Sequence, residues 1–383
     1  MANRQEEAVA NIGGFCDPDF AQVEKVFTEN FAERDELGAA VCIYRHGQPV
    51  VDLWGGWADA TRSRPWQRDT IVCMMSVGKG IAALCVWMLI GRGQIALDAP
   101  VARYWPGFAQ AGKAGITVAT LLAGKAGLLY ADHAPDGAGF DWEVMIEALE
   151  RQCPEWEPGT DHGYHSATAG YLLGELVRRV DGRAIDQFLR EEITGPLGVS
   201  YGYGADWADP ALIADIVPNP ESHTFVQTRD RSTKLGRAWR MRPDSPDHYN
   251  DARLRSGLMP STNGHGNARA VARIFAVLAG GGSLDGVSVV SPETIELMRK
   301  ESWFGRCAMT DRTFRYGHGF FLSEPLMSPM GSNPRAFGHP GAGGALGFAD
   351  PENEIAFSYS PSLMCGGAGL GERCLALVAA AYV

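Results

Sequence analysis

Positive charge is scarce in this chain compared with negative charge. The 383 residues include 34 lysines and arginines against 45 aspartates and glutamates, which gives a formal net charge of −11. Proteins that bind nucleic acids or anionic membranes present basic surfaces, so this composition argues against both kinds of partner. It leaves the substrate open, because the charge of a local site can differ from the average over the chain.

Paired cysteines and long apolar runs are also missing. None of the eight cysteines forms a C-x-x-C pair, so we expect neither a zinc site nor a redox motif. No metal-ligand cluster is visible either, and we expect no cofactor. The longest apolar run, residues 81–90, is too short to span a bilayer. The first residues, MANRQEEAVANIGGF, lack the basic and apolar segments of a signal peptide. Scattered thiols are typical of a reducing compartment, and we therefore expect a cytoplasmic protein.

The apolar pattern predicts strands at both ends of the chain and helices between them. Helical spacing covers residues 19–31, 76–90, 142–152, 168–180, 267–279 and 370–382. Strands are predicted over 39–44 and 49–54, joined at His46-Gly47 as a hairpin, and over 317–322, 344–349 and 355–359. This order predicts an α/β protein of the α+β type, in which N- and C-terminal segments build one antiparallel sheet with flanking helices.

The middle of the chain is predicted to be an insertion into that sheet domain. We expect residues 1–111 and 261–383 to form the α/β domain, and residues 112–260 to form a mostly helical inserted region. Within the insertion, residues 206–249 are charged, rich in proline and without periodicity, so they are interpreted as loops that form a wall or lid. The active site is expected between the two parts.

Ser76-Val77-Gly78-Lys79 opens the most apolar of the predicted helices. Positions i and i+3 share a helix face, so the Lys79 amine can reach the Ser76 hydroxyl. Burial disfavours the ammonium form, which would let Lys79 accept the serine proton. The pattern alone also fits a capping serine and a surface lysine. A lysine one turn into an apolar helix is costly, however, unless the protein uses it.

Two glycine-containing segments carry further candidates. Tyr164 follows the turn-forming residues 157–160, and a nearby cation would let its phenol move protons, although loop tyrosines often only pack. We interpret the adjacent His165 as a supporting residue and not as the base. Residues 337–344, FGHPGAGG, allow a close approach of backbone to ligand, so the N–H of Ala342 is a candidate oxyanion donor. A plain turn is the alternative for this segment.

In this order and at these spacings, Ser76-x-x-Lys79, Tyr164-x-Ser166 and His339-x-Gly341 resemble the class C β-lactamase-related serine hydrolases. The closest branch is the family VIII carboxylesterases. The likeness extends over nearly the whole chain. Further segments that resemble family landmarks are residues 97–101, 120–128, 157–174, 195–198 and 256–262.

The resemblance implies a β-lactamase/penicillin-binding-protein-like fold and a role for each matching residue. Ser76 would be the acylated nucleophile, and Lys79 and Tyr164 would act together as general base and then as acid. The backbone N–H groups of Ser76 and Ala342 would form the oxyanion hole, and no metal is implied. The residues implied in substrate binding are Ser166, His339 and Gly341.

Two motifs depart from the β-lactamases of this family. Ser166 stands where they carry asparagine, and His339-Pro340-Gly341 stands where they carry Lys-Thr-Gly. The lost lysine and threonine would hold a β-lactam carboxylate, and histidine is mostly neutral at pH 7. An uncharged small ester therefore becomes the favoured substrate over an antibiotic. Arg335 is the candidate for a replacement cation.

The leading hypothesis is a serine carboxylesterase that cleaves small-molecule esters through an acyl-enzyme. Amidase or peptidase activity, acyl transfer and weak β-lactamase activity on the same residues remain alternatives, and an acylated sensor without turnover is the least favoured one. Trp207, Phe225 and Trp239 are candidates for an apolar acyl pocket, although each is more often simply core. The natural substrate, the acyl length and the oligomeric state stay open.

Overall fold

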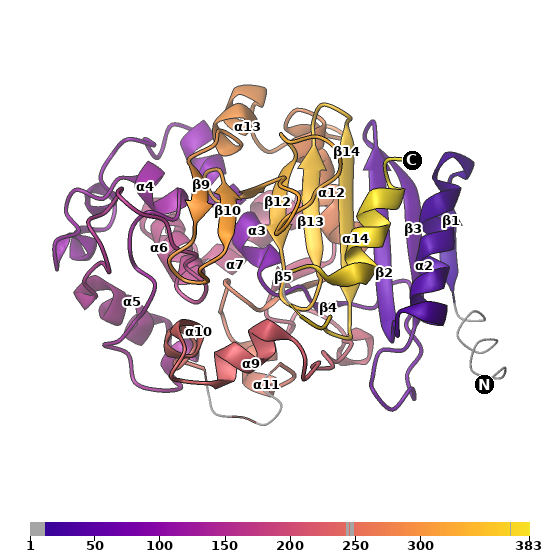
Figure 1. Ribbon diagram of the computed structural model, residues 1–383. Coiled ribbons are helices and arrows are strands. Elements are labelled where there is room, and N and C mark those ends of the chain that lie inside the picture. The colour runs from indigo at the N-terminus through magenta and orange to yellow at the C-terminus, as the bar shows by residue number, and fades with distance from the viewer. Residues whose placement is uncertain (1–11, 243–244, 246–248, 368) are drawn as a thin grey trace.

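The computed structural model describes residues 12–242, 245, 249–367 and 369–383. Its main sheet has nine antiparallel strands within these residues, in the order β1-β3-β2-β14-β13-β12-β11-β10-β9. The strands are β1 (Gly13–Cys16), β2 (Gly38–Arg45), β3 (Gln48–Gly56), β9 (Trp303–Arg306), β10 (Thr313–Tyr316), β11 (Phe321–Leu322), β12 (Phe337–Pro340), β13 (Leu346–Asp350) and β14 (Ile355–Pro361). β2 pairs with β14, so the two ends of the chain meet inside one sheet (Figure 1). The predicted sheet is confirmed.

The predicted N-terminal hairpin is present. β2 and β3 pair from Gly38 opposite Gly56 to Arg45 opposite Gln48. The connecting residues, His46 and Gly47, have φ values of 50° and 73°. Positive φ at both central residues matches the twist of paired strands, which is why this turn suits a two-residue hairpin.

Two predicted strands near the C-terminus begin later than expected. Over 317–322 only the last two residues form a strand, because the chain reverses after β10 through Gly319, whose φ is 93°. Over 344–349 the strand begins two residues late, because Gly343 and Gly344 have φ values of 86° and 106°. Extended strands need negative φ, so these glycines belong to the preceding turn.

All six helices predicted from apolar spacing are present, with ends shifted by at most two residues. They are α2 (Ala21–Glu33), α3 (Val77–Gly91), α5 (Trp142–Arg151), α6 (Ala169–Asp181), α12 (Ala268–Ala279) and α14 (Gly371–Ala380). α12 packs on β2, β13 and β14, while α14 packs against α2. In Figure 1, α2 and α14 lie in front of the sheet and α12 lies behind it. The central strands are therefore covered on both faces, and β2 is buried from Gly38 to Tyr44.

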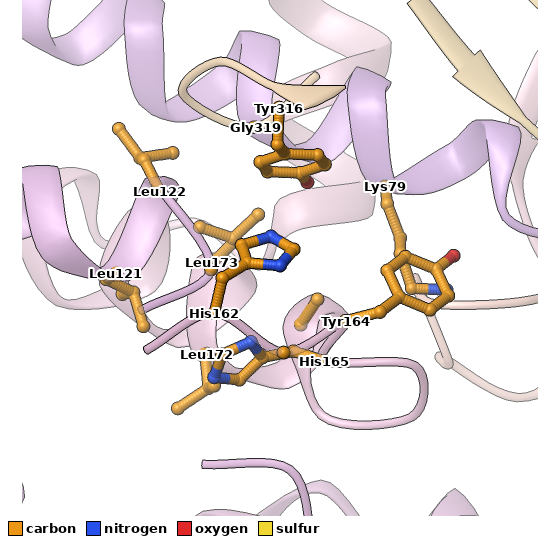
Figure 2. Close-up of a pocket in the computed structure, with 13 residues that line it drawn as sticks. Lys79, Leu121, Leu122, His162, Tyr164, His165, Leu172, Leu173, Tyr316 and Gly319 are labelled. Carbon is orange, nitrogen blue, oxygen red and sulfur yellow. The ribbon is translucent and has the colours of Figure 1, made fainter. Parts of the chain in front are cut away.

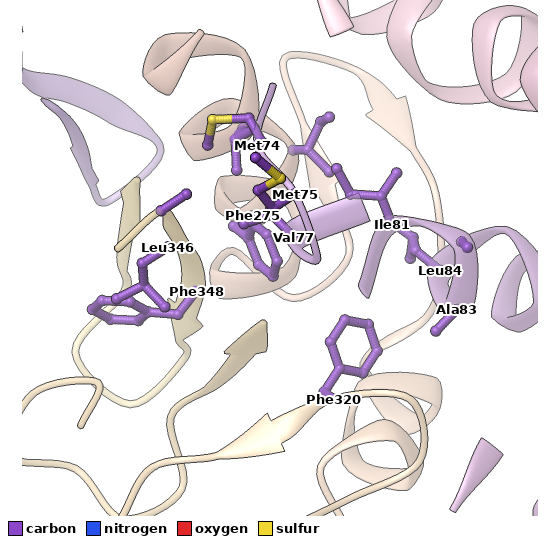
Figure 3. Close-up of a cluster of buried hydrophobic side chains, with 14 of the residues drawn as sticks. Met74, Met75, Val77, Ile81, Ala83, Leu84, Phe275, Phe320, Leu346 and Phe348 are labelled. Carbon is purple, nitrogen blue, oxygen red and sulfur yellow. The ribbon is translucent and has the colours of Figure 1, made fainter. Parts of the chain in front are cut away.

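α3 is the central helix of the core. Every residue from Val77 to Leu89 is buried, and the helix packs against α6, α7 (Ile185–Leu189) and β12. Figure 3 shows the residues around its start near Phe275 of α12 and Leu346 of β13. Each fully buried side chain of this kind contributes about 1.5–3 kcal/mol. Packing on several sides therefore fixes the place where α3 begins.

The region predicted to consist of loops, 206–249, contains two short helices, so that prediction is wrong in part. They are α9 (His223–Arg229) and α10 (Lys234–Ala238). The side chain of Ser222 accepts a bond from the N–H of Phe225, and that of Thr233 accepts one from the N–H of Gly236. Helices of five to seven residues are too short to show apolar periodicity, but these serine and threonine caps are visible in the sequence.

A second sheet of three short strands was not predicted. It joins β4 (Val72–Cys73), β6 (Gly264–Gly266) and β5 (Tyr201–Tyr203) in that order. The remaining helices and strands are α4 (Val118–Leu122), α8 (Gly195–Leu197), α11 (Ala252–Ser256), α13 (Pro292–Met298), β7 (Ser283–Leu284) and β8 (Val287–Ser288). Over the ranges that the structure describes, no helix has both the length and the apolar character needed to cross a membrane.

Candidate active site

Ser76 lies between β4 and α3, where the chain turns sharply. Met75 has a φ of 50°, a left-handed conformation that is uncommon for residues other than glycine. Ser76 directly precedes α3, yet its side chain makes no capping bond to the helix. Its backbone N–H donates to no backbone carbonyl among the described residues. Both groups therefore remain available at the positive end of the helix dipole.

Lys79 is buried next to this hydroxyl and is not a surface lysine. Its Nζ lies 2.8 Å from Ser76 Oγ and donates to the backbone oxygen of Ser261 at 2.5 Å. The side chain is only 2% exposed. Burial, followed by the charge of Arg242, lowers the pKa of Lys79 well below its ordinary value. A neutral amine held against a serine hydroxyl is the arrangement that activates such a nucleophile.

Tyr164 packs next to both Lys79 and Ser76. The Lys79 Nζ lies 5.1 Å from the centre of its ring, and Phe314, Phe321 and His339 surround the ring at centroid distances of 5.9–6.0 Å. Burial raises the pKa of Tyr164, and a hydrogen bond with Ser76 opposes this effect in part. The phenol is therefore protonated at rest and can donate a proton.

The residues after Tyr164 have structural partners. Trp239 donates from Nε1 to Ser166 Oγ at 2.9 Å, which ties the tyrosine segment to the end of α10. The Nε2 of His165 accepts a bond from the N–H of Leu128 at 3.1 Å. Burial lowers the pKa of His165 to about 4, so the ring is neutral near pH 7. We therefore interpret His165 as a residue that supports the tyrosine segment through its bond with Leu128, and not as the base.

The glycine-containing segment 337–344 lies directly beside the nucleophile. Gly341 donates to the backbone oxygen of Ala345 at 2.6 Å, which closes the turn after β12. A Cβ added at Gly341 would lie 2.5 Å from the backbone oxygen of Met74, so only glycine permits this approach. The N–H of Ala342 donates to no backbone carbonyl within the described ranges. Ala342 and Ser76 thus bring two available N–H groups to the same place.

His339 belongs to β12, and its side chain is completely buried. Its Nδ1 is 2.8 Å from the backbone oxygen of Pro340, and no described residue bonds to its Nε2. Burial and the charge of Lys79 lower the pKa of His339 to about 3. His339 is not among the residues that line the cavity beside Ser76, so its predicted contact with substrate stays a prediction.

A cavity of about 130 Å³ opens beside Ser76. The predicted site residues on its wall are Ser76, Tyr164, Ser166, Gly341 and Ala342. Trp239 also lines it, as expected for a residue of an acyl pocket. Trp207 lines a different pocket, and Phe225 packs on Tyr249 without lining this cavity, so these two expectations are wrong.

The cation proposed from the sequence is also in the wrong place. Arg335 is about half exposed and pairs with Glu296 and Glu352 on the surface. The arginines on the wall of the cavity are Arg242 and Arg312 instead. Nothing in the sequence distinguishes these two from the other arginines, because their position depends on how segments 206–249 and 307–322 fold over the sheet.

A second cavity lies behind Lys79 and Tyr164 (Figure 2). Leucines of α4 and α6 line it together with His162, His165 and Tyr316. Burial lowers the pKa of His162 to about 3, so this ring is also neutral near pH 7. Across the described ranges, no group of three or more histidine, cysteine, aspartate or glutamate side chains is placed to hold a metal.

Comparison with known proteins agrees with this geometry. The family model for Beta-lactamase matches residues 23–364. The esterase/beta-lactamase LipL of Mycobacterium tuberculosis is 34% identical over 378 residues, which cover 95% of this chain and 87% of LipL. A solved family VIII carboxylesterase has a TM-score of 0.88 at 35% identity, covering 97% of this chain and 98% of that one. A penicillin-binding protein homologue from Caulobacter crescentus has a TM-score of 0.86 at 36% identity, covering 97% and 99%. The chain therefore belongs to the Beta-lactamase family and has its penicillin-binding-protein-like fold.

Proposed function

We propose that this protein is a serine carboxylesterase of the β-lactamase type, which cleaves small esters through an acyl-enzyme on Ser76. The main support is the 2.8 Å approach of the buried Lys79 amine to Ser76 Oγ, beside an open cavity that Ser76 itself lines. The names of two relatives, an esterase/beta-lactamase and a family VIII carboxylesterase, support ester cleavage over other acyl-transfer reactions.

In this proposal each group at the site has one task. The neutral Lys79 amine takes the proton as Ser76 Oγ attacks the ester carbonyl carbon, and the N–H groups of Ser76 and Ala342 hold the oxyanion. Tyr164 donates its proton to the leaving alkoxide and regains one from the protonated Lys79, so the alcohol departs and acyl-Ser76 remains. The same pair then activates water, which releases the acid and restores Ser76.

The proposed site draws residues from both parts of the chain proposed from the sequence, residues 1–111 with 261–383 and residues 112–260. Ser76 and Ala342 come from the first part, while Tyr164 and Ser166 come from the second. A site shared by two packed parts can place groups that neither part could place alone. We propose this division as the domain organisation of the protein.

A cytoplasmic location also belongs to the proposal. All eight cysteines are free thiols, and six of them are buried. Free buried thiols are typical of proteins in a reducing compartment. Small-molecule esters are the proposed partners.

The test is the loss of ester hydrolysis in Ser76→Ala, measured with short-chain 4-nitrophenyl esters. We expect kcat/KM to fall by several orders of magnitude with an unchanged circular dichroism spectrum, because the hydroxyl contributes chemistry and little packing. A fluorophosphonate should label the wild-type protein once, on the Ser76 peptide, because the oxyanion hole favours tetrahedral phosphorus. Near wild-type activity in Ser76→Ala, or a label on Ser166 or Ser261, contradicts the proposal.

The same assay separates esterase from the alternative activities. A cephalosporin and an aminoacyl anilide are compared with the nitrophenyl esters on the wild-type protein. Activated esters need only the nucleophile and the oxyanion hole, so we expect their kcat/KM to be the highest of the three. Equal or faster turnover of the cephalosporin would place the protein among the β-lactamases, and faster turnover of the anilide would make it an amidase.

A further inference from the structure

The cavity beside Ser76 has a charge opposite to that of the whole protein. The chain carries a net charge of −11. The described residues that line the cavity nevertheless include two arginines, Arg242 and Arg312, and no aspartate or glutamate. Charges of one sign around a cleft with low-dielectric walls focus the field, so this cavity attracts anions from an otherwise acidic protein.

Arg242 packs against two aromatic rings. Its guanidinium carbon lies 4.2 Å from the ring centre of Trp239 and 5.9 Å from that of Tyr249. Burial lowers the pKa of Arg242 from its ordinary value, and a hydrogen bond with Tyr249 opposes the effect. No described carboxylate forms an ion pair with it. Arginine stays charged in proteins, so a partly buried guanidinium with no ion-pair partner among the described residues carries a desolvation cost that an incoming carboxylate would offset.

The position of Arg242 connects it to the reacting atoms. Its ring partner Trp239 donates to Ser166 Oγ, two residues after Tyr164. Its charge is close enough to Lys79 to be the second cause of the lowered pKa of that amine. Arg312 on the wall bonds to His223 Nδ1 at 2.7 Å, and the Thr310 hydroxyl on the same wall is buried without a partner among the described residues. The wall therefore offers the Arg242 guanidinium and the Thr310 hydroxyl, neither of which has an acidic partner among the described residues.

We propose that Arg242 binds a carboxylate of the substrate, and that the preferred substrates are esters that carry a carboxylate, such as monoesters of short dicarboxylic acids. This inference rests on the proposed ester hydrolysis at Ser76. It revises the expectation of an uncharged ester, because the cation missing from the strand at His339 is supplied by the facing segment after α10. A planar guanidinium can bind a carboxylate with two parallel hydrogen bonds.

The test compares two substrates of equal length that differ in one charge. They are the mono-4-nitrophenyl ester of glutaric acid, which is anionic, and 4-nitrophenyl pentanoate, which is neutral. We expect Arg242→Gln to lower the anionic-to-neutral ratio of kcat/KM by about ten- to a hundredfold, the value of one charge-assisted contact. The ratio within each variant cancels any general loss of activity.

Arg335→Gln is the matched control. It removes the same charge at an exposed position outside the cavity, so its ratio should equal that of the wild type. An equal ratio in the wild type and Arg242→Gln overturns the inference, while hydrolysis of the pentanoate by the wild type leaves the proposed function standing. Absence of hydrolysis of both esters by folded wild-type protein overturns the proposed function instead.

A second measurement does not depend on the folding of the variant. The anionic-to-neutral ratio of the wild type should fall as sodium chloride is added, because salt screens the attraction of the cavity for the carboxylate. A ratio that does not change with salt overturns the inference even if Arg242→Gln fails to fold.

Discussion

At the scale of single residues, the surroundings of the amine beside Ser76 favour its neutral form. Lys79 is buried, and the charge of Arg242 adds to the effect of burial in lowering its pKa. The pKa of Tyr164 changes in the other direction, because burial raises the pKa of its phenol. A neutral base and a neutral acid, each within reach of one hydroxyl, are what a proton transfer in both directions needs.

We expect kcat/KM for a neutral ester to rise with pH as Lys79 loses its proton, with a midpoint well below the ordinary value of 10.5. Arg242→Gln removes a cation that disfavours the ammonium form, so the pKa of Lys79 rises and the midpoint moves to higher pH. The measurement is a pH–rate profile corrected for spontaneous hydrolysis, with Arg335→Gln as control. A midpoint that stays in place in Arg242→Gln, or an unchanged profile in Lys79→Met, contradicts this assignment.

At the scale of elements, the turn after β12 packs closely against the segment before α3 at Gly341. A Cβ at Gly341 would come within 2.5 Å of the Met74 backbone oxygen, and backbone cannot yield as a flexible side chain can. The two N–H groups proposed for the oxyanion, those of Ser76 and Ala342, lie on the two sides of this contact. Their separation therefore depends on the absence of a side chain.

Gly341→Ala should lower kcat for short esters by roughly a hundredfold, because a displacement of about 1 Å at a reacting geometry costs that much. The fold should persist, since the added methyl group displaces only this turn. Gly115→Ala is the control, because it adds the same methyl group at an exposed position with no atom within 4 Å. The measurements are steady-state kinetics and thermal unfolding of both variants. Full activity in Gly341→Ala would show that catalysis does not need the close approach of Gly341 to the Met74 backbone.

At the scale of the whole molecule, folding buries several histidines as neutral rings. Burial lowers the pKa of His162 and His339 to about 3 and that of His165 and His265 to about 4. In the unfolded chain these rings titrate near 6.5. As the pH falls below 6.5, the unfolded chain therefore binds protons that the folded protein does not, and the free energy of unfolding decreases down to the folded-state pKa values.

We expect the free energy of unfolding, measured with urea, to be lower at pH 5 than at pH 7. Each buried histidine contributes a slope of roughly 1.4 kcal/mol per pH unit within its window. His265→Gln, away from the cavity, should reduce the slope by about one such contribution. Equal slopes in His265→Gln and the wild type would mean that His265 does not titrate on unfolding.

Much of the architecture was determined by the sequence itself. The six long helices and the N-terminal hairpin follow from apolar spacing and from one two-residue turn, which are local properties of the chain. The proximity of Ser76 and Lys79 follows for the same reason, because three residues on a helix span a fixed distance. Strand ends at Gly319, Gly343 and Gly344 were misplaced, because positive φ at a glycine cannot be read from the residue type alone.

Only the tertiary structure decided which distant residues share the cavity. Arg335 is close to His339 in sequence yet pairs with Glu296 on the surface, while Arg242 stands on the cavity wall. Trp239 reaches Ser166 across 73 positions of the chain. Such contacts depend on how segment 206–249 packs over the sheet. Burial, which sets the charge of Lys79 and of the histidines, likewise exists only once the chain has folded.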